Sequence, residues 1–281
     1  MQVLSSNTIS DALLVSIPRL ANVLPPDILE ALIAARDRET HERAKIVLDQ
    51  LVLNAQIASE DHVPICQDTG TVWCCLEVGP DIGLNANVFS KVNQSVAAAF
   101  INSKLRKSVV RDALFDRTNT GDNTPAFCEL RLVDEPGVAR LHIMLKGGGS
   151  DNASRVVMLT PNAGKQGVIE TVLACVEEKA ANACPPLVIG VGVGTTFDKV
   201  AGLAKLALMR PLNVPSPNPE VAAFERELLD AVNATGIGAG GLGGDTTALG
   251  VRVKTAPCHI AALPVAVNMG CSAMRRLTVE L

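Results

Sequence analysis

The sequence predicts an α+β fold in which mixed, largely antiparallel sheets are flanked by helices in a single compact domain. Nearly half of the 281 residues are apolar, which is enough for a sizeable core. Strand-like segments occur in hairpin-like runs as well as between helices, which favours antiparallel pairing over a doubly wound parallel sheet. No repeat, low-complexity tract or linker divides the chain. We therefore expect one domain over residues 1–281, with N-terminal helices in 1–62 packed on it.

Helices are indicated by apolar residues that recur at a period of 3.6. In one segment Val88, Val92, Val96 and Phe100 recur along one face. Gly236, directly after the last such segment, predicts a helix C-cap. The predicted helices span residues 25–40, 40–61, 86–105, 165–183, 195–211 and 218–235.

Strands are indicated by alternation and by short, β-branched apolar runs. Leu141, Ile143 and Leu145 alternate with other residues, and Cys74 and Cys75 are expected on opposite faces of one strand. Residues 111–127 are rich in Asn, Asp, Thr and Gly and are expected to form a loop. The predicted strands span residues 71–79, 127–133, 140–148, 187–194, 248–256 and 260–270.

Composition and charge exclude several classes of function. The 29 acidic and 25 basic residues are dispersed, so no basic stripe for nucleic acid is present. Aromatic residues make up only 2% of the chain, which leaves no stacking platform for bases. Neither a signal peptide nor a run of membrane-spanning length is expected. The composition predicts a cytoplasmic protein that binds neither nucleic acid nor membrane.

Glycine-rich stretches occur at residues 147–149, 190–194 and 236–244. The second has GxGxG rather than GxGxxG spacing, so an NAD-dependent oxidoreductase is only a weak alternative. The third has Asp245 where a phosphate-binding loop needs lysine. Glycine can instead supply positive φ angles and close backbone approach. Three such loops together also suggest backbone amides that converge on an anion.

Eight cysteines are present, and no two form a CxxC pair. Cys66, Cys184 and Cys271 are expected at the ends of elements, where thiolates can point into a shared cavity. The others are predicted to pack inside elements (Cys74, Cys75, Cys128 and Cys175), with Cys258 intermediate between the two groups. Three separated thiolates could hold a cubane iron–sulfur cluster with one iron free of protein ligands. Packed, unliganded thiols remain the other interpretation.

Seven motifs, in order along the chain, extend from the first third to the end. They are PICQDTGT, LRKS, NTGDNTPAF, KGGGSDNAS, ACPPLVIGVGVGTT, GIGAGGLGGDTTALGV and CSAMRR. Together they resemble the iron–sulfur-dependent class I fumarate hydratase and L-tartrate dehydratase family, specifically its N-terminal domain or alpha subunit. The resemblance covers almost the whole chain. It implies a [4Fe-4S] cluster held by Cys66, Cys184 and Cys271.

The same resemblance implies the roles of five further residues. Gln67, Arg106 and Gly149 would bind substrate, with the guanidinium suited to a carboxylate and the glycine acting through its amide. Asp68 and His259 would be catalytic and would move protons near the departing oxygen.

The implied reaction is the reversible loss of water from a 2-hydroxy dicarboxylate. The wording of NTGDNTPA favours (S)-malate and fumarate, a step of the tricarboxylic acid cycle, with L-tartrate or a mesaconate-type substrate as alternatives. Because the family's remaining catalytic residues lie in a C-terminal domain, we expect a separate beta subunit in an alpha2-beta2 assembly. A non-catalytic iron–sulfur sensor or scaffold is the alternative from another class.

Overall fold

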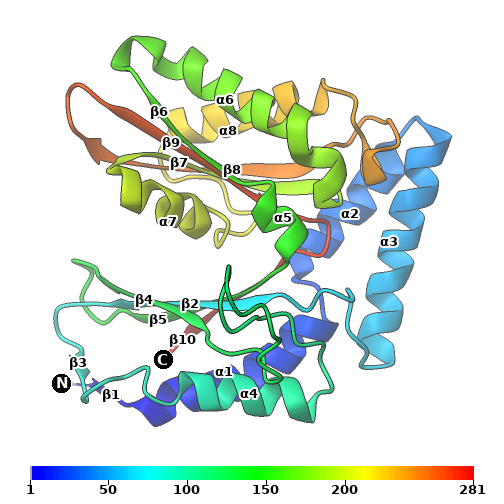
Figure 1. Ribbon diagram of the computed structural model, residues 1–281. Helices are drawn as coiled ribbons and strands as arrows, with labels where there is room; N and C mark the ends of the chain where they lie inside the picture. Colours follow the sequence, from blue (N-terminus) through cyan, green and yellow to red (C-terminus); the bar gives the residue numbers. More distant parts are fainter. Residues whose placement is uncertain (1) are drawn as a thin grey trace. The chain divides into compact units, whose positions relative to one another are not determined.

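The computed structural model describes residues 2–281, which form two compact units built from non-contiguous segments (Figure 1). Unit 1 contains the described residues up to Pro25, together with Ala55–Gly148 and Arg275–Leu281. Unit 2 contains Pro26–Asn54 and Gly149–Met274. The chain therefore passes between the units four times, and the N-terminal helices are shared between them.

Unit 1 is built on a four-stranded sheet with the order β10-β5-β2-β4. β2 is parallel to β4, whereas β5 is antiparallel to both β2 and β10. The helices α1 and α4 pack on the apolar face of this sheet, and the short strands β1 and β3 pair beside them (Figure 1). The bounds are β1 Val3–Leu4, α1 Ser6–Asn22, β2 Thr71–Val78, β3 Gly83–Leu84, α4 Val92–Asn102, β4 Phe127–Leu132, β5 Ala139–Lys146 and β10 Arg275–Glu280.

The helix α1 begins at a capping box, in which Ser5 and Thr8 each satisfy the other's backbone amide. Its apolar side chains, Ile9, Leu13 and Ile17, are completely buried in the core of unit 1. Contrary to expectation, the segment Ser6–Arg38 is long and apolar enough by composition to cross a membrane. Two separate helices occupy that segment, and the burial of the α1 face accounts for its apolar character.

Unit 2 is built on a second four-stranded sheet, with the order β6-β9-β7-β8. The helices α6 and α8 cover one face and α7 covers the other (Figure 1). The helical bounds are α2 Pro26–Arg38, α3 Glu42–Glu60, α5 Gly148–Asn152, η1 Pro161–Ala163, α6 Gly164–Lys179, η2 Ala180–Ala183, α7 Phe197–Ala207, α8 Pro219–Asn233 and η3 Ala239–Gly241. The strands are β6 Arg155–Leu159, β7 Leu187–Thr195, β8 Ala248–Cys258 and β9 Leu263–Gly270. Two of these helices are divided between the units: the C-terminal part of α3, from Ala55, and the first residue of α5, Gly148, belong to unit 1.

The glycines of GVGVG allow α7 to pack closely on β7. A Cβ atom on Gly190 would lie 2.3 Å from the Ala204 carbonyl oxygen, and one on Gly192 would lie 2.6 Å from that of Val200. Residues 190–194 therefore belong to a strand, and the expectation that they form an anion-binding loop is wrong. Close helix–sheet packing is the reason for glycine at these two positions.

The α+β class is confirmed, with four antiparallel and three parallel strand pairings among the described residues. Each predicted helix and strand is present, although α4 starts at Val92 rather than near residue 86. The C-cap of α8 is Ala234 rather than Gly236, which lies two residues further on with a φ of +66°. The longer elements that were not predicted are α1, β6 and β10, and the short β1, β3 and α5 were not predicted either.

Gln2 and Leu281, the first and last described residues, are adjacent within unit 1. Gln2 Nε2 donates a hydrogen bond of 3.0 Å to the carbonyl oxygen of Leu281, and the amide of Leu281 donates to Ala139 in β5.

Candidate functional site

The segment Cys66–Gly70 of unit 1 forms a turn between α3 and β2. Its N-terminal side is held by the buried Ile65, whose amide donates to the Ala21 carbonyl at 2.9 Å. The thiol of Cys66 donates to Gln67 Oε1 at 3.3 Å, so these two predicted site residues are in contact. Both are at least partly accessible: Cys66 is half-buried and Gln67 is exposed.

The carboxylate of Asp68 connects this turn to the segment that follows β5. Its Oδ1 accepts from the Gly70 amide at 3.0 Å, and its Oδ2 accepts from the Gly148 amide at 2.8 Å. The Ser108 hydroxyl donates to Oδ1 at 3.4 Å. The half-buried carboxylate of Asp68 therefore fixes the backbone at Gly70 and Gly148 by accepting hydrogen bonds from their amides.

Gly70 is required by the close passage of this turn over β5. Its φ is +81°, and a Cβ atom there would lie 2.7 Å from the backbone of Lys146. The Gly70 carbonyl accepts from Asn123 Nδ2 at 3.1 Å, and Asn123 Oδ1 in turn accepts from the Ser108 amide at 2.7 Å. Asn123 is fully buried, so one residue of the NTGDNTPA motif holds the turn in place.

Arg106 lies on the loop after α4. Its backbone carbonyl accepts a hydrogen bond from the buried Thr69 hydroxyl, which anchors the loop to the turn. Its side chain is exposed. The structure thus brings Cys66, Gln67, Asp68 and Arg106 into one region of unit 1 through contacts of the same turn.

Arg275, the first residue of β10, is a member of this region that sequence reasoning did not find. It is 1% exposed, and its Nη2 donates to the Asp68 carbonyl oxygen at 2.8 Å. Its Nε and Nη1 atoms have no hydrogen-bond partner among residues 2–281. The CSAMRR motif was the only signal in the sequence, and nothing in it distinguishes a buried arginine from a surface one.

In unit 2, Cys184 and Cys271 lie on adjoining segments. Cys184 is exposed, with a left-handed φ of +57°, and precedes Pro185 and β7. Its carbonyl oxygen accepts from the amide of Ser272, the residue after Cys271, at 3.0 Å. Because β7 and β9 pair with Val188 opposite Gly270, both cysteines lie at the same end of this sheet.

Gly149 lies on α5, which also leads to that end of the sheet. The Ser154 hydroxyl donates to the Ser150 carbonyl at 3.2 Å and accepts from the Met269 amide at 3.1 Å. The segment that carries Gly149 is thereby fixed to β9 two residues before Cys271. Within unit 2 the structure brings Gly149, Cys184 and Cys271 to one region.

His259 does not join that region. It follows β8, where Cys258 pairs with Thr195 at the far end of β7. β7 is 9 residues long, which corresponds to roughly 30 Å at the rise of a β-strand. Within unit 2, His259 therefore lies a strand length away from Cys184 and Cys271.

The remaining cysteines have environments suited to packing. Burial raises the pKa of Cys75 to about 12 and also raises the pKa of Cys175. A hydrogen bond with Cys128, together with burial, raises the pKa of the Cys74 thiol, while the same hydrogen bond lowers the pKa of Cys128. Cys74, Cys75, Cys128 and Cys175 therefore lie inside regular elements, as predicted, and not on turns.

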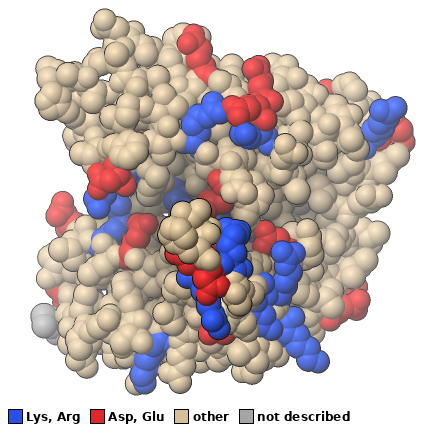
Figure 2. All heavy atoms as spheres, viewed as in Figure 1, with Lys and Arg blue, Asp and Glu red and all other residues tan. Residues whose placement is uncertain are grey.

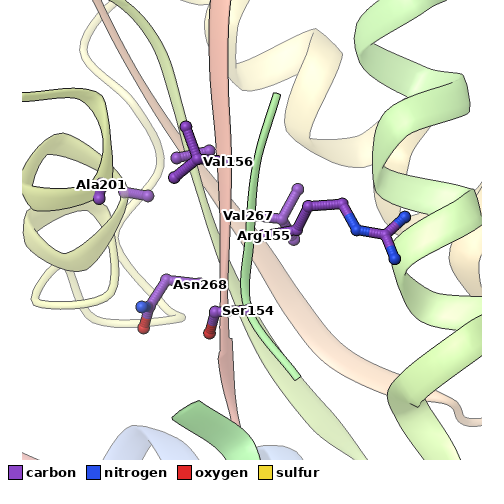
Figure 3. Close-up of a pocket in the computed structure, with 8 residues that line it drawn as sticks. Ser154, Arg155, Val156, Ala201, Val267 and Asn268 are labelled. Carbon is purple, nitrogen blue, oxygen red and sulfur yellow. The ribbon is translucent and has the colours of Figure 1, made fainter. Parts of the chain in front are cut away.

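A cavity of about 140 Å³ lies on the α7 side of the unit 2 sheet. Figure 3 shows Asn268, Val156 and Ala201 on this side, while Arg155 and Val267 point to the opposite face. Asn268 is 8% exposed, and its Oδ1 has no partner among residues 2–281. With Ser154 it forms the polar edge of the cavity, whose volume suits a few water molecules.

Glu39, His41 and Asp245 form a cluster elsewhere in unit 2. The buried Glu39 accepts from the Asp245 amide at 2.9 and 3.1 Å and from the His41 amide at 3.1 Å. The Thr40 hydroxyl donates to Asp245 Oδ2 at 2.6 Å and lowers the pKa of that carboxyl. These hydrogen bonds fasten the loop between α2 and α3 to the glycine-rich loop before β8.

The charged side chains form no single-sign field on the face shown in Figure 2, where Lys, Arg, Asp and Glu are interspersed. This distribution agrees with the mild acidic balance of the sequence.

Comparison with known proteins identifies the class. Residues 12–280 match the model of the family described as fumarate hydratase (Fumerase), and this match makes the chain a hydro-lyase. The chain belongs to this Fumerase family, as the seven motifs predicted. It is 37% identical, over 95% of both chains, to the "Putative L(+)-tartrate dehydratase subunit alpha" of Methanocaldococcus jannaschii. It is 33% identical to the L(+)-tartrate dehydratase subunit alpha of Escherichia coli K12, over 91% of this chain and 85% of that one.

Proposed function

We propose that the chain is the alpha subunit of a hydro-lyase that reversibly removes water from a 2-hydroxy dicarboxylate. Family membership and the names of the relatives support this reaction class. The structural observation that carries the proposal is the placement of Cys184 and Cys271 on adjoining turns. Cys66 lies on a third turn, beside the amide of Gln67 and the carboxylate of Asp68.

The donor set fits an iron–sulfur centre, which we propose to be a [4Fe-4S] cluster held by Cys66, Cys184 and Cys271. All three lie outside regular elements, none forms a disulfide, and none is fully buried. Thiolates are the usual ligands of such clusters. When bound, a cluster with one iron free of protein ligands supplies a Lewis acid for the hydroxyl and carboxylate of the substrate.

The chain's own residues would bind the dianion and move its protons. The exposed guanidinium of Arg106 suits a carboxylate, because it can donate two parallel hydrogen bonds. The Gln67 amide and the backbone N–H of Gly149 add uncharged donors. Asp68 is the proposed acid or base near the departing hydroxyl. His259 lies at the other end of the unit 2 sheet from Cys184, and its catalytic role stays a prediction.

The names of the relatives favour L(+)-tartrate as substrate. The NTGDNTPA wording favours (S)-malate instead, and a mesaconate-type diacid is the third candidate. All three share the same chemistry, in which a proton leaves the carbon next to one carboxylate while hydroxide leaves its neighbour.

The names of the relatives also designate alpha subunits. We therefore propose a separate beta subunit that completes the catalytic residues, in an alpha2-beta2 assembly. The isolated chain is expected to be inactive.

The test is anaerobic purification of the chain together with its candidate beta subunit, followed by iron and sulfide analysis and by assays with all three substrates. About four irons per chain are expected. Dehydration of L(+)-tartrate or (S)-malate is expected to require the beta subunit. Replacement of Cys66, Cys184 or Cys271 by Ala should remove both iron and activity.

Cys258→Ala is the matched control. Cys258 is exposed like Cys184, but it lies at the opposite end of the unit 2 sheet. It should keep full iron and full activity. Full activity of the isolated, cluster-loaded chain would contradict the need for a beta subunit, and absence of iron in the complex would overturn the cofactor.

A further inference from the structure

Arg275 is a buried cation whose guanidinium is only partly hydrogen-bonded within the described chain. It is 1% exposed, and two of its three nitrogens have no hydrogen-bond partner among residues 2–281. A guanidinium removed from water without full hydrogen bonding is strongly unfavourable. Stability alone gives no reason to keep an arginine at this end of the sheet, where Arg275 is opposite Leu145.

A hydrogen bond from this guanidinium connects Arg275 to the proposed site. Its Nη2 donates to the backbone carbonyl of Asp68 at 2.8 Å. A carbon atom placed on Gly147 would lie 3.3 Å from Asp68 Oδ2 and 3.8 Å from Arg275 Nη2, so the guanidinium also lies near the carboxylate. Hydrogen bonds from a charged donor are among the stronger ones in proteins.

The other contacts of Asp68 show what this hydrogen bond controls. The side chain of Asp68 is held by the amides of Gly70 and Gly148, while its backbone carbonyl is held by Arg275. Cys66 is anchored independently, because the preceding Ile65 amide bonds to Ala21. Loss of Arg275 should therefore disturb Asp68 more than the cysteine two residues earlier.

We propose that Arg275 is a positioning residue that fixes the orientation of Asp68. The role rests on the proposed function, in which Asp68 moves a proton during dehydration. Arg275 itself is enclosed and does not touch substrate. A residue that sets the direction of an acid or base affects the chemical step more than substrate binding.

The variants are Arg275→Met and Arg275→Lys, each purified with the beta subunit under anaerobic conditions. We expect Arg275→Met to lower kcat by about 10- to 100-fold, the range for loss of one charge-assisted hydrogen bond. KM should change by less than about 3-fold, and the iron content should equal that of the unmodified complex. Arg275→Lys keeps a cationic donor and should recover part of kcat.

Stability separates positioning from a merely structural role. Replacing a poorly paired buried charge by a methionine of similar length is often neutral or stabilising. The Tm of Arg275→Met should therefore not fall while kcat does. Arg140→Met is the matched control: Arg140 lies on the same sheet, pairs with Glu135 and is opposite Glu280, so kcat and KM should stay unchanged.

A kcat of Arg275→Met within 2-fold of the unmodified enzyme would overturn the proposal, as would loss of iron or a larger change in KM than in kcat. If Arg275→Met does not fold, the proposal stands or falls on whether Arg275→Lys shows a reduced kcat with unchanged KM. Amide hydrogen exchange of the free chain provides a readout independent of activity. Arg275→Met should increase exchange at residues 66–70, and Arg140→Met should not. If the unmodified complex lacks dehydratase activity, the proposed function fails, and exchange alone then decides whether Arg275 holds the turn.

Discussion

Two cysteines in adjacent strands show how a residue's surroundings determine its chemistry. Cys74 and Cys128 are opposite each other in the parallel pair β2–β4, and their contact shifts the two pKa values in opposite directions. Cys75 points to the other face of the same strand, where burial raises its pKa to about 12. Cys184, by contrast, lies on a turn and is exposed. Thiol reactivity should therefore differ widely among cysteines of one chain.

Alkylation of the metal-free chain by iodoacetamide at pH 8 tests this difference. Cys184 and Cys258 should be labelled first, because both are exposed. Cys75 should resist labelling, since at a pKa of about 12 only about one thiol in ten thousand is ionised at this pH. Mass spectrometry of peptides over time gives the rates. Labelling of Cys75 as fast as Cys258 would contradict the burial of β2.

The site residues show which interactions a sequence can reveal. Cys66, Gln67, Asp68 and Arg106 were predicted from their motifs, and contacts of one turn bring them together. Arg275 was not predicted, because only the structure shows that its guanidinium is enclosed and bonded to Asp68.

Elements were predicted where their hydrophobic periodicity is long and regular. The helices α2, α3, α6 and α8 were found in this way. The strands β6 and β10 are short, with 5 and 6 residues, and stand beside charged or glycine-rich segments that hide their pattern. The position of His259 shows a different difficulty. It is near Cys271 in the sequence, but β9 carries the chain along the sheet between them.

Close packing of α7 on β7 can be tested by one methyl group. Gly192→Ala places a Cβ atom 2.6 Å from the Val200 carbonyl oxygen and 2.7 Å from the Ala204 amide nitrogen. Because both are backbone atoms of a helix, they cannot move aside cheaply. We expect the free energy of unfolding to fall by about 1–3 kcal/mol, measured by urea denaturation.

Gly236→Asn is the control for this change. Gly236 has a positive φ, which Asn tolerates, and a Cβ atom there would meet nothing within 4 Å. This substitution should lower the free energy of unfolding by only a few tenths of a kcal/mol. An equal, small loss for Gly192→Ala would show that α7 is not fixed against β7.

At the scale of the whole molecule, the two units are not consecutive in the sequence. Unit 1 is completed only by Arg275–Leu281, whose strand β10 pairs with β5 along its full length. Unit 2, by contrast, is complete at Met274. We therefore expect Arg275–Leu281 to contribute much of the stability of unit 1.

A chain that ends at Met274 should retain unit 2 and lose the stability of unit 1. Limited proteolysis should cut residues 55–148 at least about 10-fold faster than in the full chain, because removal of β10 leaves β5 as an unpaired, apolar edge. Peptides from residues 149–274 should remain protected. A chain that ends at Glu280 serves as the control. Equal resistance of both units in the shortened chain would show that β10 is dispensable.

The hydrogen bond between Gln2 and Leu281 shows that the first and last described residues lie next to each other. A short glycine–serine connection could join the two ends, and new ends could be opened in the exposed stretch around Leu114 and Phe115. Such a circular permutant would make β10 an internal strand and keep its pairing with β5. The order of synthesis of the two units would then change without altering the turn that holds Asp68.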